Sequence, residues 1–286
     1  MKENAENKMR FPRPAIGESH LVSSGKVILE YHVSGSGETV VLLPAFARAA
    51  SDFNELAVVL NDAGYRTVAV EPRGMGRSIC PILPRATMHD FATDVATVVG
   101  HLDEVAGGRV HVVGRAFGAR VARAFATDYP HLTRTAILLA GGGAVRPVKS
   151  RLWRYLLGNF RFVPQWLRGR VVGVTLYAAG NTPPRYLAYR HPIRAVRRQF
   201  AALRTPLDDN WKAGSVPMLW IHGQEDTLVP VEDALALSDR FPEQLKLVVI
   251  PRAGHALLPE QPGLVQDALL AFLRQYPLQT TLEAIS

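Results

Sequence analysis

Short runs of β-branched and aliphatic residues alternate with helical patterns through most of this 286-residue chain. The runs are too short for buried helices, and the segments between them repeat apolar residues at helical spacing. We therefore predict an α/β fold whose mostly parallel central sheet is covered by helices on both faces. The first strand precedes a Gly35-Ser36-Gly37 turn and is expected to form an antiparallel hairpin. The predicted strands span residues 27–32, 39–43, 66–70, 110–113, 135–139, 218–221 and 245–250.

One stretch interrupts the alternation. Residues 143–212 contain no strand pattern, only helix-like segments rich in Arg, Trp and Tyr and broken by prolines. We predict an α/β core, residues 19–142 and 213–279, with a basic helical cap, residues 143–212, inserted between two core strands. Residues 1–18 are polar and contain prolines, so a disordered or loosely ordered leader is expected there.

The predicted cap is strongly basic. It holds 14 Lys or Arg against Asp208 and Asp209, a net charge of +12, so the rest of a chain of net charge +8 carries −4. Such asymmetry indicates an anionic substrate, a membrane surface or nucleic acid, and a solvated helical face is the alternative. Nucleic acid is not expected, because no recognised binding motif accompanies the charge.

Composition also bears on the cellular setting. A single cysteine, Cys80, excludes an internal disulfide framework and suits a reducing compartment, so we expect a cytoplasmic protein. No apolar run approaches the ~20 residues of a membrane span, and the first residues lack the apolar core of a secretion signal. Peripheral membrane contact through the basic cap stays open, as does the oligomeric state. We expect no cofactor and no metal ion.

Four motifs concentrate the chemistry. The central one is Gly114-Arg115-Ala116-Phe117-Gly118, at the join between the fourth predicted strand and the helix after it. Glycines are needed on both sides of such a join because the central residue sits in a strained turn close to its neighbours. The other motifs are LLPAF at 42–46, EPRGMGRS at 71–78, and the pair GQED at 223–226 and AGH at 253–255.

In this order and at this spacing the motifs resemble those of the α/β-hydrolase fold, over residues 27–276. The resemblance implies that Ala116 stands at the nucleophile elbow, where the family has its nucleophile. It implies that His255 is the histidine of the catalytic triad. It also implies that the backbone N–H groups of Phe46 and Phe117 form the oxyanion hole. The sequence departs from the family at Pro44-Ala45, where a His-Gly pair is common, and the additional Cβ could narrow the hole.

The triad acid has two candidates, Asp226 and Glu225, and the spacing favours Asp226. Its carboxylate would accept from the Nδ1–H of His255, which fixes the histidine tautomer and stabilises the imidazolium. A structural Asp–His hydrogen bond is the alternative. His111 and His222 lie in or beside predicted buried strands and are expected to be structural.

Three residues are candidates for substrate binding. Arg115 would either bind an anion in the pocket or pair with an acidic side chain, and both interpretations stay open. Trp153 belongs to the Arg- and aromatic-rich cap, which suits an aromatic or acyl chain that carries a carboxylate. Leu257 is a candidate for an apolar pocket wall. Arg73 is expected to brace its loop.

Ala116 restricts the reaction. A methyl group cannot form an acyl-enzyme, and the chemistries that use Asp at this position, epoxide hydrolysis and dehalogenation, are excluded as well. We predict a non-covalent hydrolase or lyase-like enzyme in which His255 and Asp226 act as general base, with a backbone oxyanion hole, on a small carbonyl-containing substrate. The alternatives are an inactive binding protein of the same fold and a nucleophile-to-Ala variant of an esterase-like serine hydrolase.

Overall fold

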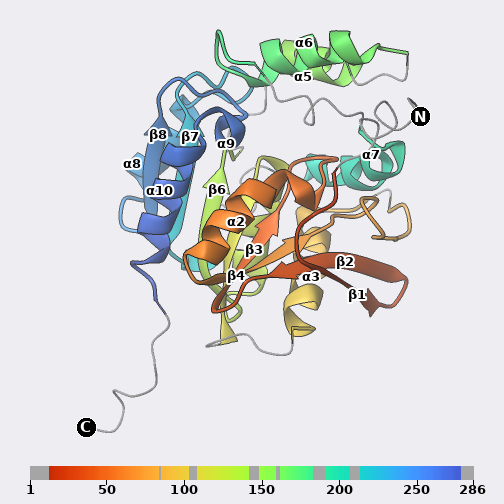
Figure 1. Ribbon diagram of the computed structural model, residues 1–286, viewed down its shortest axis with the longest axis vertical. Helices are drawn as coiled ribbons and strands as arrows, with labels where there is room; N and C mark the ends of the chain where they lie inside the picture. Colours follow the sequence, from red (N-terminus) through yellow and green to blue (C-terminus); the bar gives the residue numbers. More distant parts are fainter. Residues whose placement is uncertain are drawn as a thin grey trace, which may run out of the picture.

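The computed structural model describes residues 13–83, 85–102, 108–141, 148–158, 162–182, 191–206 and 213–277. One eight-stranded sheet has the order β1-β2-β4-β3-β5-β6-β7-β8 (Figure 1). The six strands from β3 onward run parallel, and β1 and β2 are antiparallel to their neighbours, which confirms the mostly parallel sheet. The strands are β1 (Glu18–Ser24), β2 (Val27–Ser34), β3 (Glu38–Leu43), β4 (Tyr65–Val70), β5 (Val110–Arg115), β6 (Thr133–Leu139), β7 (Met218–Gly223) and β8 (Leu245–Ile250).

The hairpin differs from the prediction. β2 pairs with β1 through a turn at Gly25, and not with β3 across the Gly35-Ser36-Gly37 turn. The strand after that turn, β3, lies between β4 and β5 instead. β1 was missed because it is an edge strand whose only fully buried side chain is that of Val22, so it carries little apolar pattern.

Helices cover both faces of the sheet, as predicted (Figure 1). One face carries α3 (Met88–Gly100), α4 (Phe117–Asp128) and α8 (Glu232–Arg240). The other carries the short 3-10 helix η1 (Ala50–Phe53), α2 (Asn54–Asp62), α9 (Leu257–Glu260) and α10 (Pro262–Leu273). Every residue of β5 is buried because this strand has helices on both sides, which explains its continuous apolar run.

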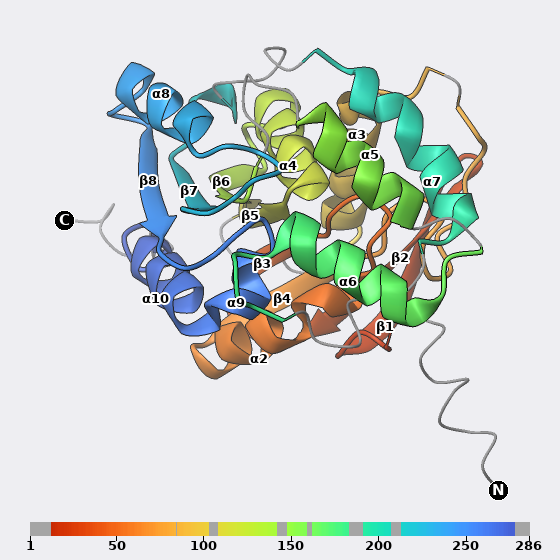
Figure 2. The same cartoon turned by 90° about the horizontal axis from the view of Figure 1, so that it is seen from above.

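Between β6 and β7 the described segments are helical. They are α5 (Lys149–Gly158), α6 (Gln165–Leu176), α7 (Ile193–Gln199) and the 3-10 helices η4 (Phe200–Arg204) and η5 (Ala213–Ser215). Seen from above, α5 and α6 lie side by side over the carboxyl edge of the sheet, and α7 lies to one side of them (Figure 2). Residues 142–147, 159–161, 183–190 and 207–212 lie outside the described residues.

The chain ahead of β1 contacts the core where it is described. Arg13 forms an ion pair with Glu55 and donates to the carbonyl oxygen of Ser51. The backbone N–H of Ile16 donates to Oδ1 of Asn54 at the start of α2. Residues 1–12, most of the expected leader, lie outside the described residues. Among the helices that are described, none has the length and apolar character to cross a bilayer.

Candidate active site

The turn between β5 and α4 keeps the strained geometry of a nucleophile elbow, although its central side chain is a methyl group. Ala116 joins β5 to α4 with φ 49° and ψ −104°, a conformation that L-residues rarely adopt. Its N–H donates to the carbonyl oxygen of Leu139 over 2.9 Å, which ties the turn to β6. A non-glycine residue held in such a conformation costs of order 1–3 kcal/mol and persists only where the surroundings impose it.

Gly118 allows the elbow to approach the end of β3. A Cβ built on Gly118 would lie 2.0 Å from the carbonyl oxygen of Leu43. The first turn of α4 therefore lies against the loop that contains Phe46. The rings of Phe46 and Phe117 meet edge to face, with 5.9 Å between their centroids. The two predicted oxyanion residues are thus neighbours, and Phe117 is the first residue of a helix, where backbone N–H groups have no intrahelical partner.

A glutamine from the helical segment between β6 and β7 supports the loop that contains Phe46. Gln199, at the end of α7, is fully buried, and its Oε1 accepts from the N–H of Ala47 over 2.8 Å. Its Nε2 donates to the carbonyl oxygen of Arg73 over 2.9 Å. Ala47 has φ 53°, so the loop is held in a strained conformation next to Phe46. No sequence signal marks Gln199, because its partners lie more than a hundred residues away.

His255 and Asp226 are in direct contact. Nδ1 of His255 lies 2.8 Å from Oδ2 of Asp226, and both side chains are buried. Oδ1 of Asp226 accepts from the N–H groups of Leu228 and Val229, each over 2.9 Å. Burial alone would raise the pKa of Asp226, but the charge of His255 and the hydrogen bonds to His255 and a second histidine lower it below its ordinary value. Asp226 is therefore ionised at neutral pH. Glu225 is exposed and does not replace it.

The second histidine is His222, which lies in β7. The indole N–H of Trp220 donates to its Nδ1 over 3.1 Å, so the proton of the neutral ring is on Nε2. That Nε2 lies 2.9 Å from the carbonyl oxygen of Val229 and 3.4 Å from Oδ2 of Asp226. His222 thus holds the loop that carries the acid. This matches its expected structural role, and its contact with Asp226 was not foreseen.

Arg115 lies in a buried polar cluster beside the elbow. Its Nη1 is 3.7 Å from Oδ2 of Asp52, and Arg48 binds the same carboxylate with two hydrogen bonds of 2.6 and 2.8 Å. Within the described part of the chain, Nε of Arg115 has no hydrogen-bond partner. Burial, with Arg48 next in effect, lowers the pKa of the neighbouring His191 to about 3, so that ring is neutral. The acid-pairing interpretation of Arg115 therefore has a partner, Asp52, which two arginines share.

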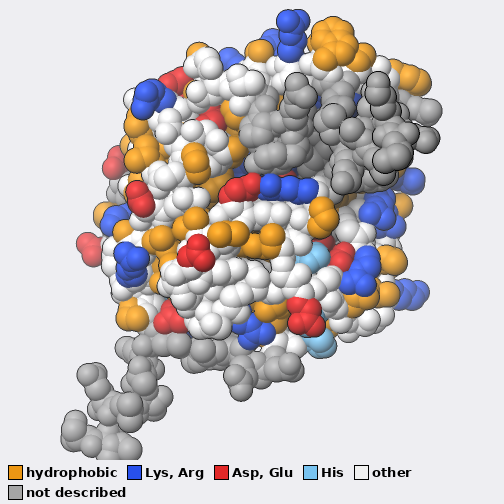
Figure 3. All heavy atoms as spheres, viewed as in Figure 1, with side chains coloured by type: hydrophobic (Ala, Val, Ile, Leu, Met, Phe, Trp, Pro, Cys, Tyr) orange, Lys and Arg blue, Asp and Glu red, His pale blue; other side chains and the backbone are white. Residues whose placement is uncertain are grey.

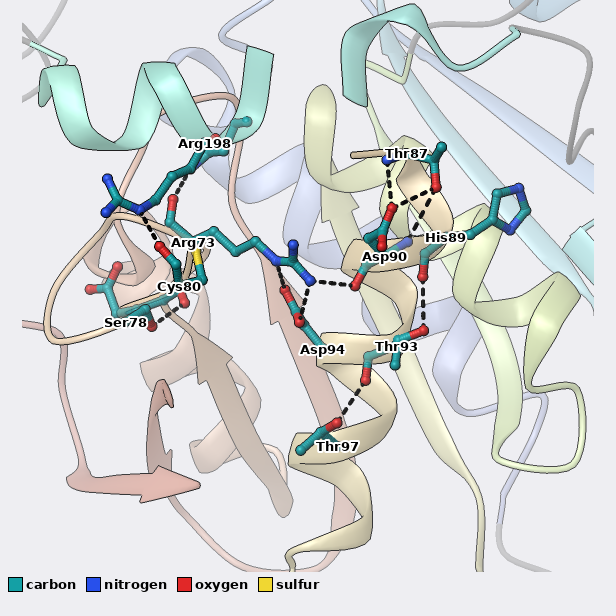
Figure 4. A network of polar contacts seen from close by, with 12 residues as sticks. Arg73, Ser78, Cys80, Thr87, His89, Asp90, Thr93, Asp94, Thr97 and Arg198 are labelled. Carbon is teal, nitrogen blue, oxygen red and sulfur yellow. Dashed lines mark hydrogen bonds and ion pairs between the residues drawn. The ribbon is translucent and has the colours of Figure 1, made fainter. Parts of the chain in front are cut away.

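Arg73 ties its loop to α3 (Figure 4). Its guanidinium donates to both oxygens of Asp94 in α3, over 2.6 and 2.9 Å, and to the carbonyl oxygen of Asp90 over 3.2 Å. Asp90 in turn closes a capping box with Thr87 at the start of α3. Asp94 also borders a cavity of about 20 Å³ behind the elbow. That cavity has room for a single water and not for a substrate.

The other two predicted substrate residues have very different surroundings. Trp153 is on α5 and its side chain is 63% exposed, so it is not enclosed in a pocket. Leu257 is fully buried at the start of α9, within the apolar core on the α2 and α10 side of the sheet. Among the described residues, no group of three or more His, Cys, Asp and Glu side chains is placed to hold a metal ion.

The sheet order, the strained elbow and the Asp–His pair at the carboxyl edge define an α/β-hydrolase fold protein. A family described as serine aminopeptidase, S33, matches residues 36–262, and the chain belongs to this family.

Characterised relatives are hydrolases. The chain is 26% identical to 2-(acetamidomethylene)succinate hydrolase of Mesorhizobium japonicum, over 89% of this chain and 95% of that protein. It is 25% identical to 2-hydroxy-6-oxo-2,4-heptadienoate hydrolase of Pseudomonas putida, over 84% of this chain and 91% of that protein. Among solved structures, a malate-bound thermophilic esterase from Thermogutta terrifontis is 26% identical, with a TM-score of 0.74 over 91% of this chain and 99% of that one.

Proposed function

We propose that this protein is a hydrolase that works without a covalent nucleophile. His255, braced by Asp226, acts as the general base, and the backbone N–H groups of Phe46 and Phe117 act as the oxyanion hole. The observation that carries the proposal is the 2.8 Å contact between His255 and an ionised, buried Asp226, in a chain whose elbow has no nucleophile. A protein that only binds a ligand has no chemical need of this pair.

The proposed reaction begins with water. Nε2 of His255 takes a proton from water, and the resulting hydroxide adds to the substrate carbonyl carbon. The carbonyl oxygen becomes an oxyanion that accepts from the two backbone N–H groups. When the intermediate collapses, the bond to the leaving group breaks and His255 returns its proton to that group. General-base catalysis contributes ~10²–10⁴-fold, and each oxyanion donor roughly 10²–10³-fold. Ala116 removes neither contribution, because the donors belong to the backbone.

We further propose that the substrate is a small organic anion with an electrophilic carbonyl group. The names of two relatives, a succinate hydrolase and a dienoate hydrolase, describe carboxylate substrates. In this chain Arg48 and Arg115 share the single carboxylate of Asp52 beside the elbow, which leaves positive charge there. Arg115 remains our candidate for binding the anionic end of the substrate. The alternative is a larger substrate that carries an acyl chain or an aromatic group. We place this activity in the cytoplasm.

The test of the base is activity on two carboxylate probes, 2-(acetamidomethylene)succinate and 2-hydroxy-6-oxo-2,4-heptadienoate. Replacing His255→Ala should lower kcat by about 10²–10⁴, whereas His131→Ala, an exposed histidine, should leave it unchanged. Equal turnover in the His255 variant would contradict the proposal. Thermal stabilisation by a probe without product formation would instead support the binding-protein alternative.

A second experiment tests the missing nucleophile. With 4-nitrophenyl acetate, the chain with Ala116 should show neither a burst phase nor an acyl adduct in its intact mass, because a methyl group cannot be acylated. Ala116→Ser should gain both if the elbow is equivalent to that of a serine esterase. A burst or an adduct in the chain with Ala116 would refute the non-covalent mechanism. A large gain in steady-state turnover by the serine variant would favour the nucleophile-to-Ala interpretation.

A further inference from the structure

Helix α5 exposes a stripe of mixed basic and apolar side chains. Lys149, Trp153 and Leu157 follow one another at intervals of four, so they lie on the same side of the helix. Trp153 is 63% exposed, Leu157 is 59% exposed, and Lys149 is exposed as well. Arg154, next to Trp153, is exposed too. A large aromatic ring among cations on the outer surface does not contribute to the core.

Helix α6 repeats the arrangement. Trp166, Arg170 and Val174 are again four residues apart, and the guanidinium of Arg170 lies 5.9 Å from the centre of the Trp166 ring. Trp166 is 65% and Val174 is 61% exposed, whereas Val172, on the opposite side of the helix, is buried. In the turn before α6, Phe162 is 78% exposed. Both helices therefore direct aromatic, aliphatic and basic groups outward together.

These side chains form one surface, here named the α5–α6 face. The two helices lie side by side at the outer end of the molecule (Figures 1 and 2), and hydrophobic and Lys or Arg side chains lie next to one another along that end (Figure 3). Adjacent exposed apolar groups of this size mark an interaction site. The face consists of Lys149, Trp153, Arg154, Leu157, Phe162, Trp166, Arg170 and Val174.

We propose that the α5–α6 face docks on an anionic phospholipid surface. Trp, Phe and Leu side chains insert at the boundary between headgroups and acyl chains, while Lys and Arg bind the lipid phosphates. Charge favours this partner, because the sequence contains no Asp or Glu between Asp128 and Asp208. No carboxylate on these two helices therefore repels an anionic headgroup.

The same charges argue against two other partners. A second copy of the chain, related by a two-fold axis, would place the same basic side chains opposite one another, with no acidic groups on the helices to pair with them. A nucleic acid would satisfy Arg154 and Arg170 but would leave Leu157 and Val174 without an apolar environment. A bilayer surface accommodates both kinds of side chain.

Docking would place the candidate site close to the lipid. The carbonyl oxygen of Leu176, the last residue of α6, accepts from the N–H of Ala256 over 2.8 Å, next to His255. Glu260 joins the same two segments a second time. It accepts from the N–H of Ala178, two residues past α6, over 2.8 Å, and from the N–H of Gly254, next to His255, over 2.9 Å. The loop of His255 and the lipid-facing helix are therefore joined directly. The docking proposal does not depend on the reaction proposed above.

The experiment is sedimentation of the full-length protein with vesicles of equal parts phosphatidylcholine and phosphatidylglycerol, and with vesicles of phosphatidylcholine alone. We expect clear binding to the anionic vesicles and little to the neutral ones. Replacing Lys149, Arg154 and Arg170 by Gln should weaken binding roughly fivefold for each charge, about a hundredfold in all. Trp153→Ser with Trp166→Ser should also abolish most binding. Leu264→Ser, which changes an exposed apolar residue on α10, is the control.

A second measurement uses fluorescence. Brominated lipids in the anionic vesicles should quench the tryptophan fluorescence of the protein, since Trp153 and Trp166 would lie at the acyl boundary, whereas Trp220 is buried in the sheet. The variant with both Trp153→Ser and Trp166→Ser keeps Trp220 and also Trp211, which lies outside the described residues, and should lose most of the quenching. Absence of quenching, equal binding to both vesicle types, or equal loss of binding in the α10 control would overturn the proposal. So would a self-association in sedimentation velocity that the two Trp substitutions abolish, because the face would then be an interface between copies.

Discussion

Glu71 should make the stability of this protein depend on pH. The carboxyl group follows β4 and is buried, and its Oε2 accepts from the N–H of Ala50 over 3.2 Å. Burial raises its pKa from 4.5 to about 8, and the nearby carboxylates of Glu30 and Asp52 act in the same direction. The folded state therefore holds a proton on Glu71 that the unfolded chain releases at lower pH.

The sign and the size follow from this difference. Between pH 4.5 and pH 8 the folded state binds more protons than the unfolded state, so the free energy of unfolding falls as pH rises. Each pKa unit corresponds to 1.36 kcal/mol, so the loss reaches about 5 kcal/mol above pH 8 and about 3 kcal/mol at pH 7. Below pH 4.5 Glu71 has no such effect. Glu71→Gln, which keeps the shape and an acceptor for Ala50, removes the contribution of Glu71 to this pH dependence.

The assay is urea-induced unfolding of the natural chain and the Glu71→Gln variant at pH 5, 7 and 8.5. We expect the variant to be more stable at pH 7 and its advantage to grow with pH. Glu243→Gln, which changes an exposed carboxylate, controls for the loss of one negative charge. A stability difference between the Glu71 variant and the natural chain that does not change across this range would refute the reasoning.

Three further substitutions test the site. Asp226→Asn should lower kcat by about 10⁴ on the carboxylate probes, because an amide N–H facing Nδ1 of His255 favours the wrong tautomer; unchanged kcat would contradict the pairing. Gly118→Ala should cost more than about 2 kcal/mol in thermal unfolding, whereas Gly100→Ala, whose Cβ meets open space, should be neutral or stabilising. Gln199→Leu should lose about 2–4 kcal/mol in urea unfolding, since two buried backbone groups lose their partners.

Much of the sheet was predictable from local pattern. β8 matches its predicted range, and most other strands extend the predicted runs by one or two residues. The inner strands β3, β4, β5, β6 and β7 are parallel and almost wholly buried, so their apolar runs are continuous and easy to identify. β8 is an edge strand, but five of its six residues are aliphatic, so its run is equally clear. β1 could not be identified in the same way, because an edge strand needs few buried side chains. The partner of β2 was mistaken because turn glycines mark a change of direction and do not specify the neighbouring strand.

Some residues of the candidate site could likewise be predicted from the sequence, and others could not. Asp226 could be predicted because it lies in a motif that resembles the family's acid motif, three residues past the end of β7. The contacts of three other residues could not be predicted, because their partners are set by the fold and not by the local sequence. These residues are Gln199, His222 and Asp52. Trp153 stays a candidate for substrate binding. An aromatic residue in a basic helix fits a pocket or an outer surface equally well until its exposure is known.

The elbow itself bears on what the site is for. Ala116 is held at φ 49° and ψ −104° without a side chain that uses the position. Glycine would adopt this backbone without strain, and a relaxed turn would serve a chain that needed only the fold. The direction of the Phe117 N–H depends on this turn. Because Gly118 has no side chain, the turn can lie against the loop that contains Phe46, and Gln199 holds that loop in place. The strain that remains supports our proposal that this turn serves the two backbone donors of an oxyanion hole.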